Sequence, residues 1–265
     1  MTNEDKTSAE LTDGASGASE SSNADASEHN GRKPLPLWQE TILLLAVALG
    51  LAVLIKAVLI QAFFIPSESM EPGLVVNDRI LVQKVSYWGG GTPERGDVVV
   101  FEDPGGWLSP VQDAGPRSLL TRAMSRIGLY PSGGHLVKRV VGVEGDVIEC
   151  CDDRGRISVN GMPLDEGAYV NEKAKCNGPM TDTCDWTAGP VPEDRIFVMG
   201  DNRGRSADST VHMCRPKQTS CVPGEEFVPT DMVVGKVFVL LWPRENFRWV
   251  TRPDVFADVP DEPDD

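Results

Sequence analysis

Histidine is scarce in this chain of 265 residues, where only His29, His135 and His212 occur, far apart from one another. A hydrolase whose nucleophile is activated by histidine is therefore difficult to assemble. The six cysteines include no paired CxxC spacing and the histidines do not cluster, so we expect no metal site and no cofactor. Internal repeats and a Rossmann-type alternation of strands and helices are also missing from the pattern.

Basic residues are in deficit as well. The chain has 25 Lys and Arg against 40 Asp and Glu, a formal net charge of −15. Ten of these fifteen excess negative charges lie in residues 1–36 and 254–265, so the middle of the chain is only mildly acidic. A nucleic-acid partner is not expected, because binding a phosphate backbone requires a basic surface.

A polar, acidic segment is followed by the longest apolar run in the chain. Residues 1–36 have almost no large apolar side chain before residue 35 and are expected to be disordered. From Ile42 to Ile65 only Lys56 and Gln61 interrupt an apolar sequence. As a helix it would reach roughly 36 Å, enough for a bilayer core. We therefore expect a transmembrane anchor over residues 37–65; a buried core helix and a cleavable signal peptide are the alternatives.

The charges beside this apolar run suggest its orientation. Arg32 and Lys33 flank its N-terminal side. The positive-inside rule then places residues 1–36 in the cytoplasm and everything after Pro66 outside it. Acidic residues contribute little to orientation, so the acidic tail does not oppose this topology.

Beyond Pro66 the sequence changes to short β-rich runs separated by Gly, Pro, Asp and Asn, which predicts a mostly β body. One segment, Ser118–Leu129, has helical periodicity and could rest on a lipid surface or cover the β core. The expected strands are Arg79–Val85, Asp97–Phe101, Leu136–Val143, Val147–Cys150, Ile157–Val159, Arg195–Met199 and Val233–Trp242.

The cysteines suggest two local disulfides. Cys176 and Cys184 bracket one short loop, and Cys214 and Cys221 bracket another. Such pairs suit an oxidising compartment, and free thiols are the alternative. The adjacent pair Cys150-Cys151 receives no assignment from the sequence.

Two serines stand in a turn fixed by prolines. Ser67 and Ser69 lie between Pro66 and Pro72, directly after the apolar run. A rigid, partly exposed turn suits a nucleophile, although serines in proline-rich turns more commonly cap or form the turn.

A lysine is the alternative base where histidine is missing. Lys138 lies in the strand-like run Leu136–Gly142. Alternation puts Lys138 on one face with Leu136 and Val140, and Arg139 on the other. We expect an inward Lys138, whose burial would lower its pKa from about 10.4, beside an outward Arg139. A lysine on the solvated face of an edge strand fits the same pattern.

A third segment, Phe197–Ser209, runs from a strand into a turn dense in Gly, Asp, Asn and Ser. Such a turn can present hydroxyls and carboxylates at the end of a strand, as an ordinary polar loop also can.

Together these segments resemble the type I (leader) signal peptidase family. With the anchor they span Leu37 to about Trp242, and the acidic tail and single anchor are compatible with an actinobacterial-type member. The resemblance rests on four blocks in the family's order: Pro66-Ser67-Glu68-Ser69-Met70-Glu71-Pro72; Gly96-Asp97-Val98-Val99-Val100-Phe101; Val137-Lys138-Arg139-Val140-Val141-Gly142 with Gly145-Asp146; and Val198-Met199-Gly200-Asp201-Asn202-Arg203 with Ser206, Asp208 and Ser209.

The resemblance implies a role for each matching residue. Ser69 would be the nucleophile and Lys138 the general base. Ser67 would donate its hydroxyl to the oxyanion hole beside the main-chain N–H of Ser69, and Ser206 would orient the lysine amine. Other matching residues would support this site, namely Gly200, Asp201, Asn202 and Asp208. Small substrate pockets would be lined by Ile65, Met70, Leu74, Leu136 and Val137.

Two positions depart from the family's pattern. Thr210 stands where the family often has an arginine, which leaves an ion pair of Asp208 open, with Arg203 or Arg205 as candidate partners. Glu144 stands in place of a frequent proline. Neither position belongs to the Ser–Lys pair.

The expected fold is thus a signal-peptidase-like β body with curved antiparallel sheets, after one N-terminal transmembrane helix. The expected parts are a cytoplasmic tail (1–36), an anchor (37–65), an extracytoplasmic peptidase domain (66–250) and an acidic C-terminal tail (251–265). The implied activity is cleavage of signal peptides from exported preproteins after Ala-x-Ala-like residues, at the bilayer of the plasma membrane.

The sequence leaves two other functions open. A LexA-like self-cleaving Ser–Lys protease would share the chemistry, but the anchor and the missing DNA-binding segment argue against it. A non-enzymatic, membrane-tethered β domain that binds partners would use the serine-rich turns only as structure.

Overall fold

The computed structural model describes residues 36–108, 134–171, 185–215, 218 and 221–261. The chain divides into two units between Leu45 and Ala46. The segment Ser118–Leu129, for which the sequence predicts a helix, lies outside the described residues.

The apolar run divides into a helix and a strand. Helix α1 covers Leu37–Val58, and strand β1 follows at Ile60–Phe64. The helix is thus shorter than the anchor expected over residues 37–65, because Ile60–Phe64 pairs in antiparallel register with Arg79–Gln83. Within the described part of the chain, no helix combines the length and the apolar character needed to cross a membrane.

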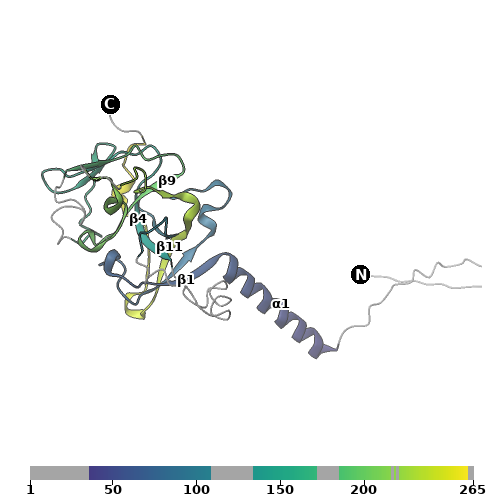
Figure 1. Cartoon of the computed structure of the whole chain (residues 1–265). Coiled ribbons are helices and arrows are strands. Elements are labelled where there is room, and N and C mark those ends of the chain that lie inside the picture. Colours follow the sequence, from purple (N-terminus) through teal and green to yellow (C-terminus); the bar gives the residue numbers. More distant parts are fainter. Residues whose placement is uncertain (1–35, 109–133, 172–184, 216–217, 219–220, 262–265) are drawn as a thin grey trace, which may run out of the picture. The chain divides into compact units, whose positions relative to one another are not determined.

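The β-rich body predicted from the sequence is confirmed. Each of the seven expected strands is present within two residues of its expected bounds, and every strand pair in the described residues is antiparallel. Figure 1 shows β4, β9 and β11, distant in sequence, within one sheet. In spatial order this larger sheet contains β1, β2 (Arg79–Gln83), β11 (Val233–Trp242), β3 (Val98–Glu102), β4 (His135–Gly142), β9 (Arg195–Met199) and β10 (Val228–Pro229), with β12 (Arg248–Trp249) paired to β11.

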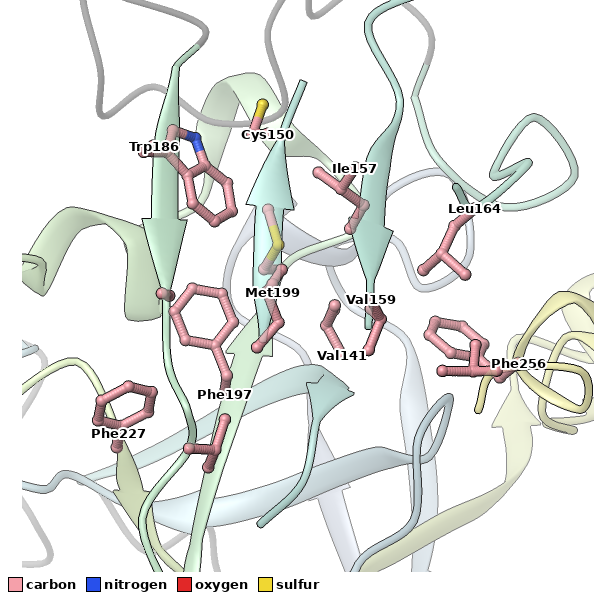
Figure 2. Packing of buried hydrophobic residues seen from close by; sticks show 14 of the residues in the cluster. Val141, Cys150, Ile157, Val159, Leu164, Trp186, Phe197, Met199, Phe227 and Phe256 are labelled. Atoms are coloured by element: carbon pink, nitrogen blue, oxygen red, sulfur yellow. The ribbon is translucent and has the colours of Figure 1, made fainter. Parts of the chain in front are cut away.

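A second, smaller sheet packs against the end of the larger one. Figure 2 shows Val141 of β4 together with Phe197 and Met199 of β9 facing side chains of the smaller sheet, among them Ile157 and Trp186. These side chains are almost fully buried and form a shared core, which ties the two sheets together. The smaller sheet is ordered β7 (Met162–Pro163), β6 (Ile157–Val159), β5 (Ile148–Cys150) and β8 (Trp186–Ala188).

The connections contain short helical turns. They are η1 (Glu68–Met70), η2 (Val85–Gly90), η3 (Arg203–Arg205), α3 (Ser209–His212), η4 (Thr230–Met232), η5 (Arg244–Asn246) and η6 (Asp254–Phe256).

The C-terminal segment is part of the body. Phe256 and Val259 are buried in the core shared by the two sheets. The Nδ2 of Asn160 donates to the main-chain oxygen of Pro260 at 2.7 Å, and Arg95 donates to that of Val259 at 3.3 Å. The segment starting at residue 251 is therefore docked up to about residue 261, where the sequence suggested only an acidic tail.

One of the two expected local disulfides is confirmed. Cys214 and Cys221 are bonded, with their Cα atoms 5.4 Å apart. The neighbours Cys150 and Cys151 are also bonded to each other, a pairing that the sequence did not indicate. Cys176 and Cys184 lie outside the described residues.

Candidate active site

The serine turn follows β1 as the short helix η1. Ser69 is 6% exposed, so its hydroxyl lies at the edge of the protein interior. The Oγ atoms of Ser67 and Ser69 are 3.2 Å apart, within hydrogen-bond distance. The turn thus presents two hydroxyls side by side, as an attacking oxygen and a nearby hydroxyl donor require.

Lys138 reaches this turn from the middle of β4. Its Nζ donates a hydrogen bond to the Oγ of Ser69 at 2.8 Å. The expected inward orientation is found: Lys138 is 4% exposed, and Val99 of β3 is its partner across the sheet. Burial lowers the pKa of Lys138 to about 8, while the carboxylates of Asp208 and Asp201 oppose this by raising it. A substantial fraction of this amine is therefore neutral at mildly alkaline pH.

Arg139 does lie on the opposite face of β4, but the expectation that it points to solvent is wrong. It is 5% exposed, and its partners are Asp201 in the polar turn, the carbonyl of Gly96 and the ring of Tyr169. Its guanidinium forms two hydrogen bonds to Asp201, at 2.8 and 2.7 Å, and lies 4.5 Å from the ring centre of Tyr169. Burial of this charge is thus compensated by a bidentate ion pair and a cation–π contact.

The polar turn after β9 holds the serine turn in place. The main-chain N–H of Asn202 donates to the carbonyl of Ser69 at 3.0 Å, and its side-chain amide donates to the carbonyl of Glu68 at 3.1 Å. A Cβ at Gly200 would lie 2.4 Å from the same Ser69 carbonyl, so only glycine allows this approach. Gly200, Asp201 and Asn202 are therefore brought to the site as the sequence indicated.

Ser206 is close to this arrangement but does not bond to the lysine. It is 1% exposed, and its Oγ has no hydrogen-bond partner among the described residues. A Cβ at Gly200 would lie 2.3 Å from that Oγ, so the hydroxyl faces the Gly200 backbone. The expected hydrogen bond from Ser206 to the amine of Lys138 is not formed in this structure.

The carboxylate of Asp208 accepts hydrogen bonds from main-chain N–H groups of the polar turn and of α3. Its Oδ2 accepts from the N–H of Gly200 at 2.9 Å, and its Oδ1 accepts from the N–H of Thr210, which caps α3. The two candidate arginine partners are engaged elsewhere: Arg203 pairs with Glu166, and Arg205 pairs with Glu68. The idea that either arginine would serve as the partner of Asp208 is therefore wrong.

The residues expected to line substrate pockets form two groups. Ile65, Met70 and Leu74 are buried in one apolar cluster, with Val137 packed against it. Leu136 belongs to a different cluster, on the face of the larger sheet that also carries Val140 and Val99. Four of the five residues thus gather beside the serine turn, and Leu136 does not join them.

Sequence reasoning missed one polar residue around the site. Glu166 receives Arg203 in a buried ion pair, although nothing in its local sequence distinguishes it from a surface acid. Ser209 belongs to the fourth block of the resemblance but received no role there; its Oγ accepts a hydrogen bond from the N–H of Val198 at 2.8 Å.

Comparison with known proteins agrees with this geometry. Residues 38–242 match the family described as "Signal peptidase, peptidase S26". The chain is 36% identical over 245 residues to a signal peptidase I of Mycobacterium tuberculosis, covering 86% of this chain and 81% of that protein. It is 35% identical over 244 residues to a probable signal peptidase I of Mycobacterium leprae, covering 82% and 80%.

A more distant relative is the probable signal peptidase I-2 of a Synechocystis species. It is 30% identical over 219 residues, covering 83% of this chain and 80% of that protein. The family match covers more than half of the chain, and the serine turn, strand β4 and the polar turn all lie inside it. The chain belongs to the type I signal peptidase family, peptidase S26, and is a serine endopeptidase.

Proposed function

We propose that Ser69 is the nucleophile and Lys138 the general base for removal of signal peptides from exported preproteins. The observation that carries this proposal is the 2.8 Å hydrogen bond between Lys138 Nζ and Ser69 Oγ, made by an amine whose pKa burial lowers to about 8. Hydroxyl nucleophiles need an adjacent base, and a desolvated lysine can act as one near neutral pH.

The reaction has two stages. Neutral Lys138 takes the proton of the Ser69 hydroxyl as Oγ attacks the scissile carbonyl. The amine then gives that proton to the departing amino group, so that an ester to Ser69 remains. A water molecule, deprotonated in the same way by Lys138, hydrolyses the ester. In this proposal the Ser67 hydroxyl, whose Oγ is 3.2 Å from the Oγ of Ser69, and the main-chain N–H of Ser69 donate to the oxyanion.

In this proposal, the pockets for the small side chains before the scissile bond are lined by the apolar cluster beside the serine turn. Ile65, Met70 and Leu74 are buried in this cluster, and Val137 packs against it. Ala-x-Ala-like sequences would therefore be accepted, whereas charged side chains would be desolvated without a partner.

The test is preprotein cleavage by matched single variants. Ser69→Ala and Lys138→Ala should each abolish cleavage, and Ser67→Ala should reduce kcat by about 100- to 1000-fold if it loses one oxyanion donor. Ser158→Ala, on β6 of the smaller sheet, is the control and should cleave normally. Near-normal turnover by Ser69→Ala or Lys138→Ala would refute the assignment.

We propose further that α1 attaches the chain to the plasma membrane, with residues 1–36 in the cytoplasm and the body outside. Support comes from the apolar side chains of α1, which lie around the helix and are strongly exposed, such as Leu45 at 68% and Leu49 at 64%. Arg32 and Lys33 at its N-terminal side fit this orientation.

Membrane fractionation tests this attachment. The full chain should stay with membranes in alkaline carbonate, and a chain lacking residues 37–58 should not. Release of the full chain by carbonate would contradict an embedded α1. Protease access to residues 1–36 only after the membrane is opened would support the orientation, and access in intact cells would overturn it.

A further inference from the structure

A segment beside the smaller sheet, Glu166–Asn171, contacts both turns of the active site. Val170 forms an antiparallel bridge with Pro72, which ends the serine turn. The N–H of Asn171 donates to the carbonyl of Asp201 in the polar turn at 3.0 Å. Backbone contacts from this one segment therefore reach the two turns that place Ser69.

The same segment supplies a buried carboxylate. Glu166 is 7% exposed, and it accepts hydrogen bonds from Arg203 Nη2 at 2.6 Å, from Arg203 Nη1 at 3.1 Å and from the hydroxyl of Tyr169 at 2.7 Å. Arg203 is fully buried. An arginine in this position needs its carboxylate, because an unpaired charge in the interior is strongly disfavoured. Glu166 thus fixes where the guanidinium lies.

Arg203 connects this carboxylate to the active site. Its Nε donates to the carbonyl of Gly200 at 2.9 Å, while Asp208 accepts from the N–H of Gly200. Side chains therefore hold the peptide groups on both sides of the Gly200 Cα. That Cα faces the Ser69 carbonyl, because a Cβ built on it would lie 2.4 Å from the carbonyl oxygen, so a shift of Gly200 would move the nucleophile relative to Lys138.

We propose that Glu166 is a positioning residue for the peptidase reaction, acting through Arg203 and Gly200 on the serine turn. Within the described residues, the hydrogen bonds of its carboxylate are to Arg203 and Tyr169, and not to the Ser–Lys pair or to the apolar cluster expected to bind substrate. The inference rests on the proposed roles of Ser69 and Lys138. Loss of Glu166 would change the distance between Ser69 and Lys138. Misplacement of reacting groups by about 1 Å can reduce the rate by about 100-fold.

The first experiment compares steady-state cleavage of one preprotein by the full chain and by Glu166→Gln. The glutamine keeps the shape of the side chain but removes the carboxylate that pairs with Arg203. We expect kcat to fall by about 10- to 100-fold while KM stays within about twofold, because positioning acts on the reaction and not on binding. Asp152→Asn, which removes the exposed ion pair with Arg156, is the matched control and should leave kcat unchanged.

A double variant separates positioning from folding. In Glu166→Met with Arg203→Met, both charges are gone, and such replacements of buried pairs commonly keep or increase stability. The double variant should unfold at a temperature at least equal to that of Glu166→Gln, yet keep the low kcat, because the Nε donor to Gly200 is lost. Recovery of normal kcat in the double variant, or an unchanged kcat in Glu166→Gln, would overturn the proposal.

Hydrogen exchange of main-chain amides tests the role of Glu166 without measuring activity, so it can fail or succeed independently of the proposed function. Amide exchange at Gly200 and Asn202 should become at least about tenfold faster in Glu166→Gln, with the amides of β3 unaffected. If the exchange changes while the full chain fails to cleave preproteins, the assigned function is wrong and the positioning contact stands. Unchanged exchange at both amides would overturn the role of Glu166 itself.

Discussion

The protonation state of Lys138 should set the alkaline optimum of the enzyme. The general base must be neutral before it can take the proton of Ser69, and burial brings its pKa to about 8. The experiment is to measure kcat/KM between about pH 6 and pH 10, because this parameter reports ionisations of the free enzyme.

The pKa gives the size of the effect. With a value of about 8, roughly one-tenth of Lys138 is neutral at pH 7, half at pH 8 and nine-tenths at pH 9. We expect kcat/KM to rise about tenfold between pH 7 and pH 9 and then level off. An unperturbed lysine would still be gaining rate at pH 10, and an unperturbed histidine would have levelled off near pH 7.5.

A fluorogenic peptide containing a cleavage site, assayed in buffers of constant ionic strength, would record this profile. Asp208→Asn supplies a directional check, because the Asp208 carboxylate raises the pKa of Lys138. Its removal should move the midpoint to lower pH, even if the rate at the plateau falls. A flat profile, a midpoint near 6.5, or an upward shift in Asp208→Asn would refute the reasoning.

Three further changes have defined outcomes. Lys138→Met should lose cleavage but be more stable than the unmodified chain, by up to about 3 kcal/mol in urea unfolding at pH 7. The reason is that folding of the variant no longer buries an amine whose pKa falls from 10.5 to about 8. For the unmodified chain, stability should rise with pH between these two values, since the unfolded lysine binds more protons there. Gly200→Ala should reduce kcat by at least about 100-fold, measured on the same peptide, because its Cβ would meet the Ser206 hydroxyl. Phe256→Ala should cost about 3 to 5 kcal/mol in urea unfolding, as a large side chain leaves the core.

These three changes also have clear contrary results. Equal or lower stability of Lys138→Met at pH 7 would mean that the amine is not desolvated. Normal turnover by Gly200→Ala would mean that the polar turn can move away from Ser69 without consequence. An unfolding midpoint unchanged in Phe256→Ala would mean that the C-terminal segment is not part of the core.

The strands were predictable because their residues alternate between two environments. Alternation put Lys138 on the same side of its strand as Leu136 and Val140, and left open whether that side is buried; the structure shows that it is. The opposite face was harder to read. A charged Arg139 in a strand suggests solvent, and only the tertiary pairing with Asp201 makes its burial possible.

The end of the apolar run could not be read from hydropathy. Ile60–Phe64 is as apolar as the helix before it, and nothing local distinguishes a membrane segment from a strand that pairs with β2. Long-range contacts decide this point. The same holds for Glu166, whose partner Arg203 is distant in sequence, and for Phe256, which lies among only a few apolar residues in an acidic segment.

The docked C-terminal segment has a consequence for the order of folding. Phe256 and Val259 leave the ribosome after every strand of both sheets, yet they complete the core that joins those sheets. Until they arrive, the core shared by the two sheets is incomplete, and Tyr169, whose hydroxyl donates to Glu166, lacks the ring of Phe256 beside it. The core between the two sheets can therefore be completed only when the C-terminal segment has been synthesised. A growing chain would contain Ser69 and Lys138 well before its peptidase domain could finish folding.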